Sequence, residues 1–287
     1  MNTKQKRLDE VSLSYDSPFF EWKGEPQPPS DNANSSCSTT TIAFQNVHGL
    51  HPRGPHASDK LHEIVNTMVH HNIQVLGISE HNIGLANPTW KQRLYESVQQ
   101  ARPRRITHQF NSGPEFDSSG RLVGGTGILV INEMTGRIEP QGNEGDAMGR
   151  WSTMHFRRQQ LPPITIIAIY QVCQSPSNAI GNTSWHQQRR YLDLHSRPEH
   201  PRQAFIKDLT TEVTKWKDKK HSIVIGGDWN DWIGSRKSSV LHLSTTLNLV
   251  DPWLIRHPID NDFPMYEHGQ HRIDSILISQ DLLPAVA

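Results

Sequence analysis

Short apolar runs alternate with clusters of turn-forming residues through most of the chain, and seven of these runs predict β-strands. The run Ile223-Val224-Ile225 has three consecutive β-branched residues, which indicates a strand buried on both faces. We expect Gly226 and Gly227 to end this strand in a tight turn. The predicted strands span residues 41–46, 73–79, 127–131, 152–156, 164–170, 223–225 and 273–278.

Two stretches carry apolar residues at the three-and-four spacing of a helix with one buried face. Ser58 is the predicted N-cap of the first helix, and lysines cluster near the C-terminal end of the second, where cations are favourable. Because both helices lead into predicted strands, the sequence indicates the α/β class. The predicted buried faces comprise Leu61, Ile64, Val65, Met68 and Val69 in the first helix, and Phe205, Ile206, Leu209, Val213 and Trp216 in the second.

Composition divides the chain into two parts. Residues 1–40 are rich in charge, proline and serine, which predicts a flexible polar leader, and residues 41–287 form one predicted domain. The formal net charge is +0, so any phosphate-binding surface must be local. The 2 cysteines make no disulfide framework, and no signal peptide or membrane-length apolar run is found. We therefore expect an intracellular protein without membrane contact.

Polar side chains stand where several predicted strands begin or end. They are Asn46 in "FQNVHGL", Glu80 in "GISEHN", Tyr170 in "AIYQV", Asp228 and Asn230 in "GGDWND", and Asp274 in "HRIDSILIS". Each alone is also typical of a capped strand end or a turn. If the sheets bring them to one rim, however, the carboxylates repel one another unless a cation compensates.

The predicted ligands are oxygen donors. Glu80 and Asn46 suit Mg²⁺, which stays mostly hydrated and takes one or two carboxylates together with substrate phosphate, and Mn²⁺ is a possible substitute. The 17 histidines are scattered, and none lies in the spacing of a zinc site. The "GGTG" stretch at residues 124–127 lacks the lysine and the spacing of a phosphate loop, so we expect it to ease close strand packing.

The order of these motifs resembles that of the endonuclease/exonuclease/phosphatase superfamily over about residues 41–287. Within that superfamily the chain looks most like the apurinic/apyrimidinic-type endonuclease domain of retroelements, through "WHQQRRYL" and "YEHGQHRIDSILIS". The resemblance implies a four-layer α/β/β/α sandwich of two mainly antiparallel sheets with outer helices. It also implies that the substrate is a nucleic acid, with DNA expected ahead of RNA. The implied place of action is the nucleus, and no obligate protein partner is implied.

The same resemblance implies a role for each site residue. Glu80 would hold the metal with help from Asn46, and Tyr170 would hydrogen-bond to the scissile phosphate. Asp228 would activate or orient the attacking water, and Asn230 would position it. The implied chemistry is in-line displacement at phosphorus, in which cation and amide donors stabilise the developing charge while a carboxylate takes the proton of the water.

Three features depart from the family's pattern. His48 stands where many relatives carry an aspartate near the metal, and Cys173 stands where the endonuclease branch has an asparagine. The family ends with a strand bearing Ser-Asp-His, whose histidine is oriented by the aspartate that corresponds to Asp274, yet no histidine follows Asp274 in this sequence. We therefore expect the last strand to be missing and the activity to be impaired, on the order of 10²–10³ in rate, unless His271 or His81 substitutes.

Three functions stay open at this point. The first is a Mg²⁺-dependent DNA endonuclease, and the second is a catalytically dead retroelement remnant that keeps the scaffold. The third is an enzyme of a sister branch, a phosphatase or an RNA deadenylase. Trp229, Trp232 and the arginine clusters at residues 102–105, 157–158 and 189–190 are candidate contacts to substrate. Such tryptophans are more often in the core, and such arginines are more often on a solvated surface.

Overall fold

The computed structural model describes residues 39–50, 57–100, 105–114, 122–140, 142, 144–174, 181–235, 237–257, 264 and 271–286. All but the last two residues of the predicted leader fall outside these ranges. The same is true of Arg102 and Arg104, which were among the predicted substrate contacts.

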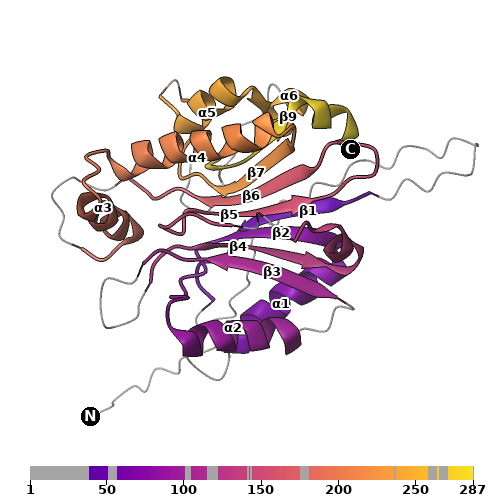
Figure 1. Cartoon of the computed structure of the whole chain (residues 1–287), viewed down its shortest axis with the longest axis horizontal. Helices are drawn as coiled ribbons and strands as arrows, with labels where there is room; N and C mark the ends of the chain where they lie inside the picture. Colours follow the sequence, from indigo (N-terminus) through magenta and orange to yellow (C-terminus); the bar gives the residue numbers. More distant parts are fainter. Residues whose placement is uncertain are drawn as a thin grey trace, which may run out of the picture.

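Two sheets pack face to face at the centre of the molecule (Figure 1). Their strand orders are β1-β2-β4-β3 and β5-β6-β7-β9-β8. Each sheet has one parallel pair, β1 with β2 and β6 with β7, and its other pairs are antiparallel. The strands are β1 (Thr41–Asn46), β2 (Ile73–Ser79), β3 (Ile106–Asn111), β4 (Thr126–Ile131), β5 (Trp151–Phe156), β6 (Ile164–Tyr170), β7 (Ser222–Asp228), β8 (Leu249–Val250) and β9 (Asp274–Ser279).

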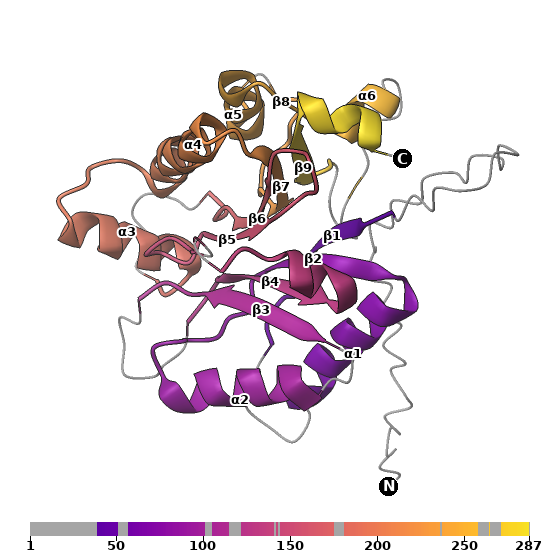
Figure 2. The same cartoon turned by 45° about the vertical axis from the view of Figure 1, so that its right-hand side comes forward.

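Helices cover the outer face of each sheet, with α1 and α2 against the first and α4 and α5 against the second (Figure 2). The helices are α1 (Ala57–His70), α2 (Pro88–Gln100), α3 (Ser184–Leu194), α4 (Pro201–Asp218), α5 (Ser239–Leu247) and α6 (Pro252–Arg256), with 3₁₀ turns η1 (Asn132–Arg137) and η2 (Gln280–Ala285). The predicted α/β/β/α sandwich is thus confirmed. Among the described residues, no helix is both long enough and apolar enough to cross a bilayer.

Three apolar clusters fill the spaces between these four layers. The predicted helix faces supply much of the two outer clusters, through residues such as Leu61 and Met68 in α1 and Phe205 and Leu209 in α4. Val69 was wrongly assigned to the buried face, since it is 51% exposed. The N-cap prediction was also wrong, because α1 begins at Ala57 and residue 58 therefore lies inside its first turn.

The two glycines before Asp228 lie within β7 rather than in a turn, so the predicted end of that strand was wrong. A Cβ on Gly226 would lie 2.3 Å from Phe44 Cδ2, and one on Gly77 would lie 2.4 Å from Phe44 Cδ1. The glycines therefore make room for Phe44, which packs between the sheets. Gly227 has a φ of +135°, and a Cβ there would lie 2.2 Å from the Ile169 carbonyl oxygen. The strand consequently reaches Asp228 only with glycine at these positions.

Candidate active site

Three of the predicted site residues lie in one row across the second sheet. Tyr170 is the register partner of Asp228 in the parallel pair β6–β7, and Asp228 is the partner of Asp274 in the antiparallel pair β7–β9. Neighbouring strands are about 4.8 Å apart, so this register brings a phenol and two carboxylates to one rim of the sheet.

The first sheet contributes Asn46 and Glu80 to the same place. Asn46 ends β1 opposite Ser79, and Glu80 directly follows β2. The Asn46 Nδ2 donates a hydrogen bond of 2.9 Å to Asp228 Oδ2, and Asn46 Oδ1 accepts one of 2.9 Å from the His48 amide. The site therefore spans the interface between the two sheets.

Glu80 has a left-handed backbone conformation, with a φ of 56°. Two main-chain hydrogen bonds hold it, from Glu80 N to Gly125 O at 2.8 Å and from Gly49 N to Glu80 O at 2.6 Å. A non-glycine residue in this region is uncommon and persists where its surroundings determine it. Its carboxylate, 17% exposed, hydrogen-bonds to the buried Tyr170 phenol.

Burial and mutual repulsion disfavour charge on this rim. Burial, followed by the negative charge of Glu80, raises the pKa of Tyr170. Burial likewise raises the pKa of Asp228 to about 6, with Glu80 adding to the effect and hydrogen bonds from the Asn230 amide and Asn46 opposing it. The pKa of Asp274 is raised to about 8, first by burial and then by Asp228. A cation among these carboxylates would relieve both causes.

The donor set fits a hard, hydrated divalent cation. Among the described residues, no three of His, Cys, Asp and Glu form a preformed metal-binding group. Mg²⁺ is commonly held by one or two carboxylates, with waters and substrate oxygens completing the shell. The Glu80 carboxylate and the Asn46 amide oxygen are the protein atoms suited to hold it.

Asn230 lies in the loop after β7, with both ends of its side chain occupied. The main-chain N–H of Asn230 donates a hydrogen bond of 2.9 Å to Asp228 Oδ1, which orients that carboxylate. Its Nδ2 donates to Gln171 O at 2.8 Å, and its Oδ1 accepts from Cys173 Sγ at 2.9 Å. Cys173 therefore fixes the orientation of the Asn230 amide.

The three histidines near the rim differ in what they can do. His48 is largely exposed, and its Nδ1 lies 3.4 Å from Glu80 Oε2. His81 is fully buried, with Nε2 donating to Asn111 O at 2.8 Å and Nδ1 accepting from Ile83 N at 3.0 Å. Burial lowers the pKa of His81 to about 4, so it is neutral, and both of its ring nitrogens are occupied by main-chain groups. His271 stacks on Trp232, with 3.9 Å between ring centroids.

Arg202, in the first turn of α4, is a positioning residue that the sequence pattern did not reveal. Its Nη1 donates to Val172 O at 2.8 Å and to Asn230 O at 3.0 Å, and its Nη2 lies 3.4 Å from Asp231 Oδ2. It thereby ties the loop after β6 to the loop after β7. In the sequence, Arg202 is distinguished only by its position after "HP" at the start of a helix, and this position does not indicate a role in the site.

Trp229 was wrongly predicted to contact substrate. It is fully buried in the outer core of the second sheet, and its Nε1 donates to Ser275 O at 2.9 Å. Arg158 makes local bonds, from Nε to Pro162 O at 2.5 Å and from Nη2 to Ser222 Oγ at 2.7 Å.

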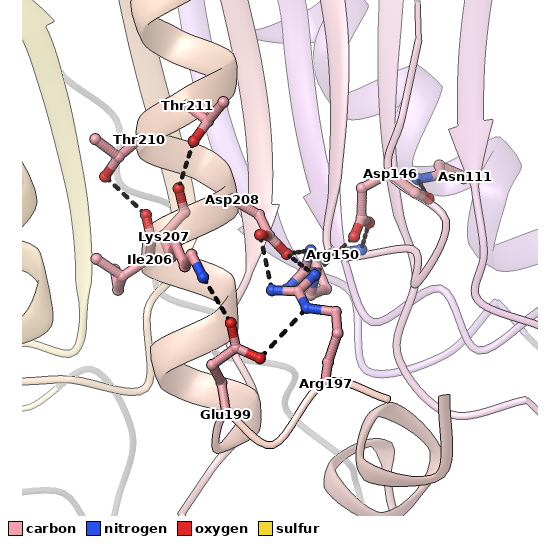
Figure 3. A network of polar contacts seen from close by, with 10 residues as sticks. All are labelled: Asn111, Asp146, Arg150, Arg197, Glu199, Ile206, Lys207, Asp208, Thr210 and Thr211. Atoms are coloured by element: carbon pink, nitrogen blue, oxygen red, sulfur yellow. Dashed lines mark hydrogen bonds and ion pairs between the residues drawn. The ribbon is translucent and has the colours of Figure 1, made fainter. Parts of the chain in front are cut away.

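A chain of alternating charges supports the strand that ends at Tyr170 (Figure 3). Buried Arg150 lies at its centre, 2.5 Å from Asp146 Oδ2 through Nε and 2.7 Å from Asp208 Oδ2 through Nη2. Arg197 also pairs with Asp208, with 2.8 Å between Arg197 Nη1 and Asp208 Oδ2. The Arg150 carbonyl accepts a hydrogen bond of 2.8 Å from the Tyr170 amide, so the network on α4 holds the end of β6.

Comparison with known proteins gives the fold class. No protein-family model and no curated protein matches the sequence. The AP endonuclease LMAP from Leishmania major is similar in structure, with a TM-score of 0.58 and 13% identity over 85% of this chain and 80% of that chain. An AP endonuclease from Archaeoglobus fulgidus gives 0.54 and 14% over 86% and 89%. The 3′ phosphatase NExo from Neisseria, bound to a product DNA hairpin, gives 0.54 and 16% over 86% and 89%.

At these identities the likeness concerns the fold. The chain has the α/β sandwich of AP endonucleases, which is the fold of the endonuclease/exonuclease/phosphatase type. Activity and substrate must therefore be argued from the site.

Proposed function

We propose that this chain is a Mg²⁺-dependent phosphodiesterase that cuts a nucleic acid strand, with DNA as its first substrate. The observation that carries the proposal is the hydrogen bond between Asn46 and Asp228, which joins the strand ends of two sheets at a rim crowded with carboxylates. Placing several partly buried carboxyl groups close together is energetically unfavourable unless they bind a cation or take part in a proton transfer. The fold shared with AP endonucleases supports the same class of chemistry.

Each residue has a proposed task. Glu80 and Asn46 hold Mg²⁺ or Mn²⁺, which supplies positive charge to the phosphate when bound. Asp228 accepts a proton from the attacking water, and its carboxylate is held in place by hydrogen bonds from Asn46 Nδ2 and the Asn230 main-chain N–H. Asn230 orients that carboxylate through its amide N–H and positions the water.

Tyr170 and Asp274 complete the proposed machinery. Because the pKa of Tyr170 is raised, the phenol keeps its proton. Glu80 accepts its hydrogen bond in this structure, and a phosphate oxygen would take that place once Glu80 holds the cation. Asp274, the register partner of Asp228 on β9, is the second carboxyl group of the proposed machinery.

The proposed substrate follows from two observations. NExo, which shares the fold, is a DNA-binding protein in its solved form. The motifs "WHQQRRYL" and "YEHGQHRIDSILIS" further favour an endonuclease of the retroelement type, acting on nuclear DNA. RNA and the phosphoesters of sister branches are the alternative substrates.

A second candidate is a catalytically dead remnant that keeps the scaffold. It is favoured by the state of the local histidines, because both ring nitrogens of His81 bond to the main chain. The assay below distinguishes this candidate from an active enzyme.

Plasmid nicking tests the proposal. We expect relaxed circles to appear with Mg²⁺, to disappear with EDTA, and to form at least about 10² times more slowly with Glu80→Gln. Lys215→Gln, an exposed change on α4, is the matched control and should leave the rate unchanged. Absence of metal-dependent nicking would favour the inactive remnant and contradict the proposal.

A further inference from the structure

His48 contacts both residues that are suited to hold the cation. Its Nδ1 lies 3.4 Å from Glu80 Oε2, and its main-chain N–H donates a hydrogen bond of 2.9 Å to Asn46 Oδ1. A carbonyl oxygen has two lone pairs, so Asn46 Oδ1 keeps one of them for a second partner. An imidazole nitrogen, a carboxylate oxygen and an amide oxygen are therefore grouped at the end of β1.

Main-chain hydrogen bonds fix the position of His48 relative to Glu80. The residues on either side of it bond to the end of β2, from Val47 N to Ser79 O at 3.0 Å and from Gly49 N to Glu80 O at 2.6 Å. His48 itself has a φ of 46°, in the left-handed region, where histidine, asparagine and aspartate are more frequent than most other residues. The loop after β1 thus holds the His48 side chain beside the Glu80 carboxylate.

The His48 side chain is also open to solvent. It is 92% exposed, whereas the Glu80 side chain is 17% exposed. A hydrated ion can therefore reach the imidazole directly, and the ring has room to turn. His81 offers no such approach, because it is buried and both of its ring nitrogens bond to the main chain.

The distance between the imidazole and the carboxylate suits two ligands of one ion. Two ligands at neighbouring corners of an octahedron, each about 2.1 Å from the ion, lie about 3 Å apart. The 3.4 Å between His48 Nδ1 and Glu80 Oε2 is slightly longer than this. Because the ring is exposed, a small rotation closes the difference.

An imidazole changes which ion such a site prefers. Carboxylate, carbonyl and water oxygens suit Mg²⁺, whereas imidazole nitrogen suits first-row transition ions, whose affinities rise along the series that begins with Mn²⁺. Neutral histidine is a common ligand of these ions through either ring nitrogen. A site that combines His48 with Glu80 and Asn46 is therefore better suited to Mn²⁺ than the two oxygen donors alone.

We propose that His48 is a third protein ligand of the cation and shifts the preference of the site from Mg²⁺ towards Mn²⁺. This inference rests on the proposed function, because it takes Glu80 and Asn46 as ligands of the same ion. Binding of the ion can nevertheless be measured without DNA and without turnover.

Mn²⁺ binding to the full chain tests the proposal. Electron spin-echo spectra of bound Mn²⁺ detect an imidazole nitrogen in its coordination shell. We expect this signal in the wild type and its loss in His48→Asn, which keeps a residue that tolerates the left-handed backbone. In calorimetry, the ratio of Mn²⁺ affinity to Mg²⁺ affinity should fall about tenfold or more in the same variant. His62→Ala, at an exposed position of α1, is the matched control and should leave both measurements unchanged.

A second variant tests the same idea in the opposite direction. His48→Asp replaces the nitrogen donor with a carboxylate, so we expect it to bind Mg²⁺ more tightly than the wild type does. Unfolding temperatures of both variants close to that of the wild type would exclude misfolding as the cause of any change.

The failure of this inference and the failure of the proposed function are distinguishable. Absence of the nitrogen signal from the wild type, which is the result for a His48 that only pairs with Glu80, would overturn the inference. A signal or an affinity ratio that persists in His48→Asn would also overturn it. If such a protein still nicks DNA with Mg²⁺, the proposed function stands alone. Loss of the signal in His48→Asn, with no nicking by the wild type, would support the ligand and contradict the proposed function. No binding of either ion would overturn both.

Discussion

The Asn46 side-chain amide lies 2.9 Å from an oxygen of Asp228, a residue 182 positions away in the sequence. This bond connects the end of β1 in one sheet to the end of β7 in the other. The proposed centre is therefore a product of the sheet-to-sheet packing, and changes at that interface should affect it.

Removing this bond should weaken the centre without unfolding the protein. In Asn46→Ala the Asp228 carboxylate loses a donor that favours its charged form, and the metal loses an oxygen ligand. We expect kcat/KM for DNA cleavage to fall about tenfold or more and Mg²⁺ binding measured by calorimetry to weaken. Asn66→Ala, on the exposed side of α1, provides the control. An Asn46→Ala protein with wild-type kinetics would refute the assignment.

The sheet interface should reject a single added methyl group. In Gly226→Ala the new Cβ would meet Phe44 at 2.3 Å, so we expect a loss of about 1–3 kcal/mol in urea unfolding. Phe44→Leu should recover part of that loss in the double variant. Gly136→Ala, which meets nothing within 4 Å, should change stability by about 0.5 kcal/mol or less. A Gly226→Ala protein as stable as Gly136→Ala would contradict this packing.

Most of the strands that could be predicted have a continuous apolar run that is buried between two layers. β6 agrees with its predicted bounds, and β7 was found but predicted too short. β3, with the sequence ITHQFN, was missed because it is an edge strand whose polar side chains give no continuous run. α2 and α5 were missed because the first is mostly polar and the second is rich in Ser and Thr, so that packing rather than propensity decides them.

The site residues stood out in the sequence because strands end on polar groups there. What the pattern could not reveal were residues that act by position alone, such as Arg202 on α4. Arginines at helix starts are common, and only the fold shows what they contact. The burial of Trp229 was unpredictable for the same reason, since the residue after Asp228 turns back into the core.

The charge network behind Tyr170 should contribute to stability far more than a surface ion pair. Asp208→Ala leaves Arg150 buried, at 3% exposure, without one of its two carboxylates, and we expect a loss of about 2–4 kcal/mol in urea unfolding. Lys215→Ala breaks an exposed pair with Glu212 and should cost about 0.5 kcal/mol or less. Equal losses of stability in the two variants would show that the network contributes no more to stability than a surface ion pair.

His155 should make the protein less stable in acid. Burial lowers its pKa to about 4, with His221 and Lys219 adding to the effect, whereas the unfolded chain titrates near 6.5. Between these values the unfolded state binds the extra proton, so stability is fully present above about pH 6.5 and falls as the pH drops towards 4. We expect this fall, up to about 3 kcal/mol, to be smaller in His155→Gln. Urea unfolding from pH 7.5 to 4 would disprove the prediction if both proteins lost stability equally.

The rate of DNA nicking by Asp228→Asn compared with wild type tests the central claim most directly. This substitution keeps the size of the side chain and removes the proposed proton acceptor. With Mg²⁺ at pH 7.5 we predict a rate lower by about 10²–10⁴, with unfolding temperatures and DNA affinity close to those of the wild type. Equal nicking rates for the two proteins would show that the strand ends joined by Asn46 and Asp228 are not where the phosphodiester is cut.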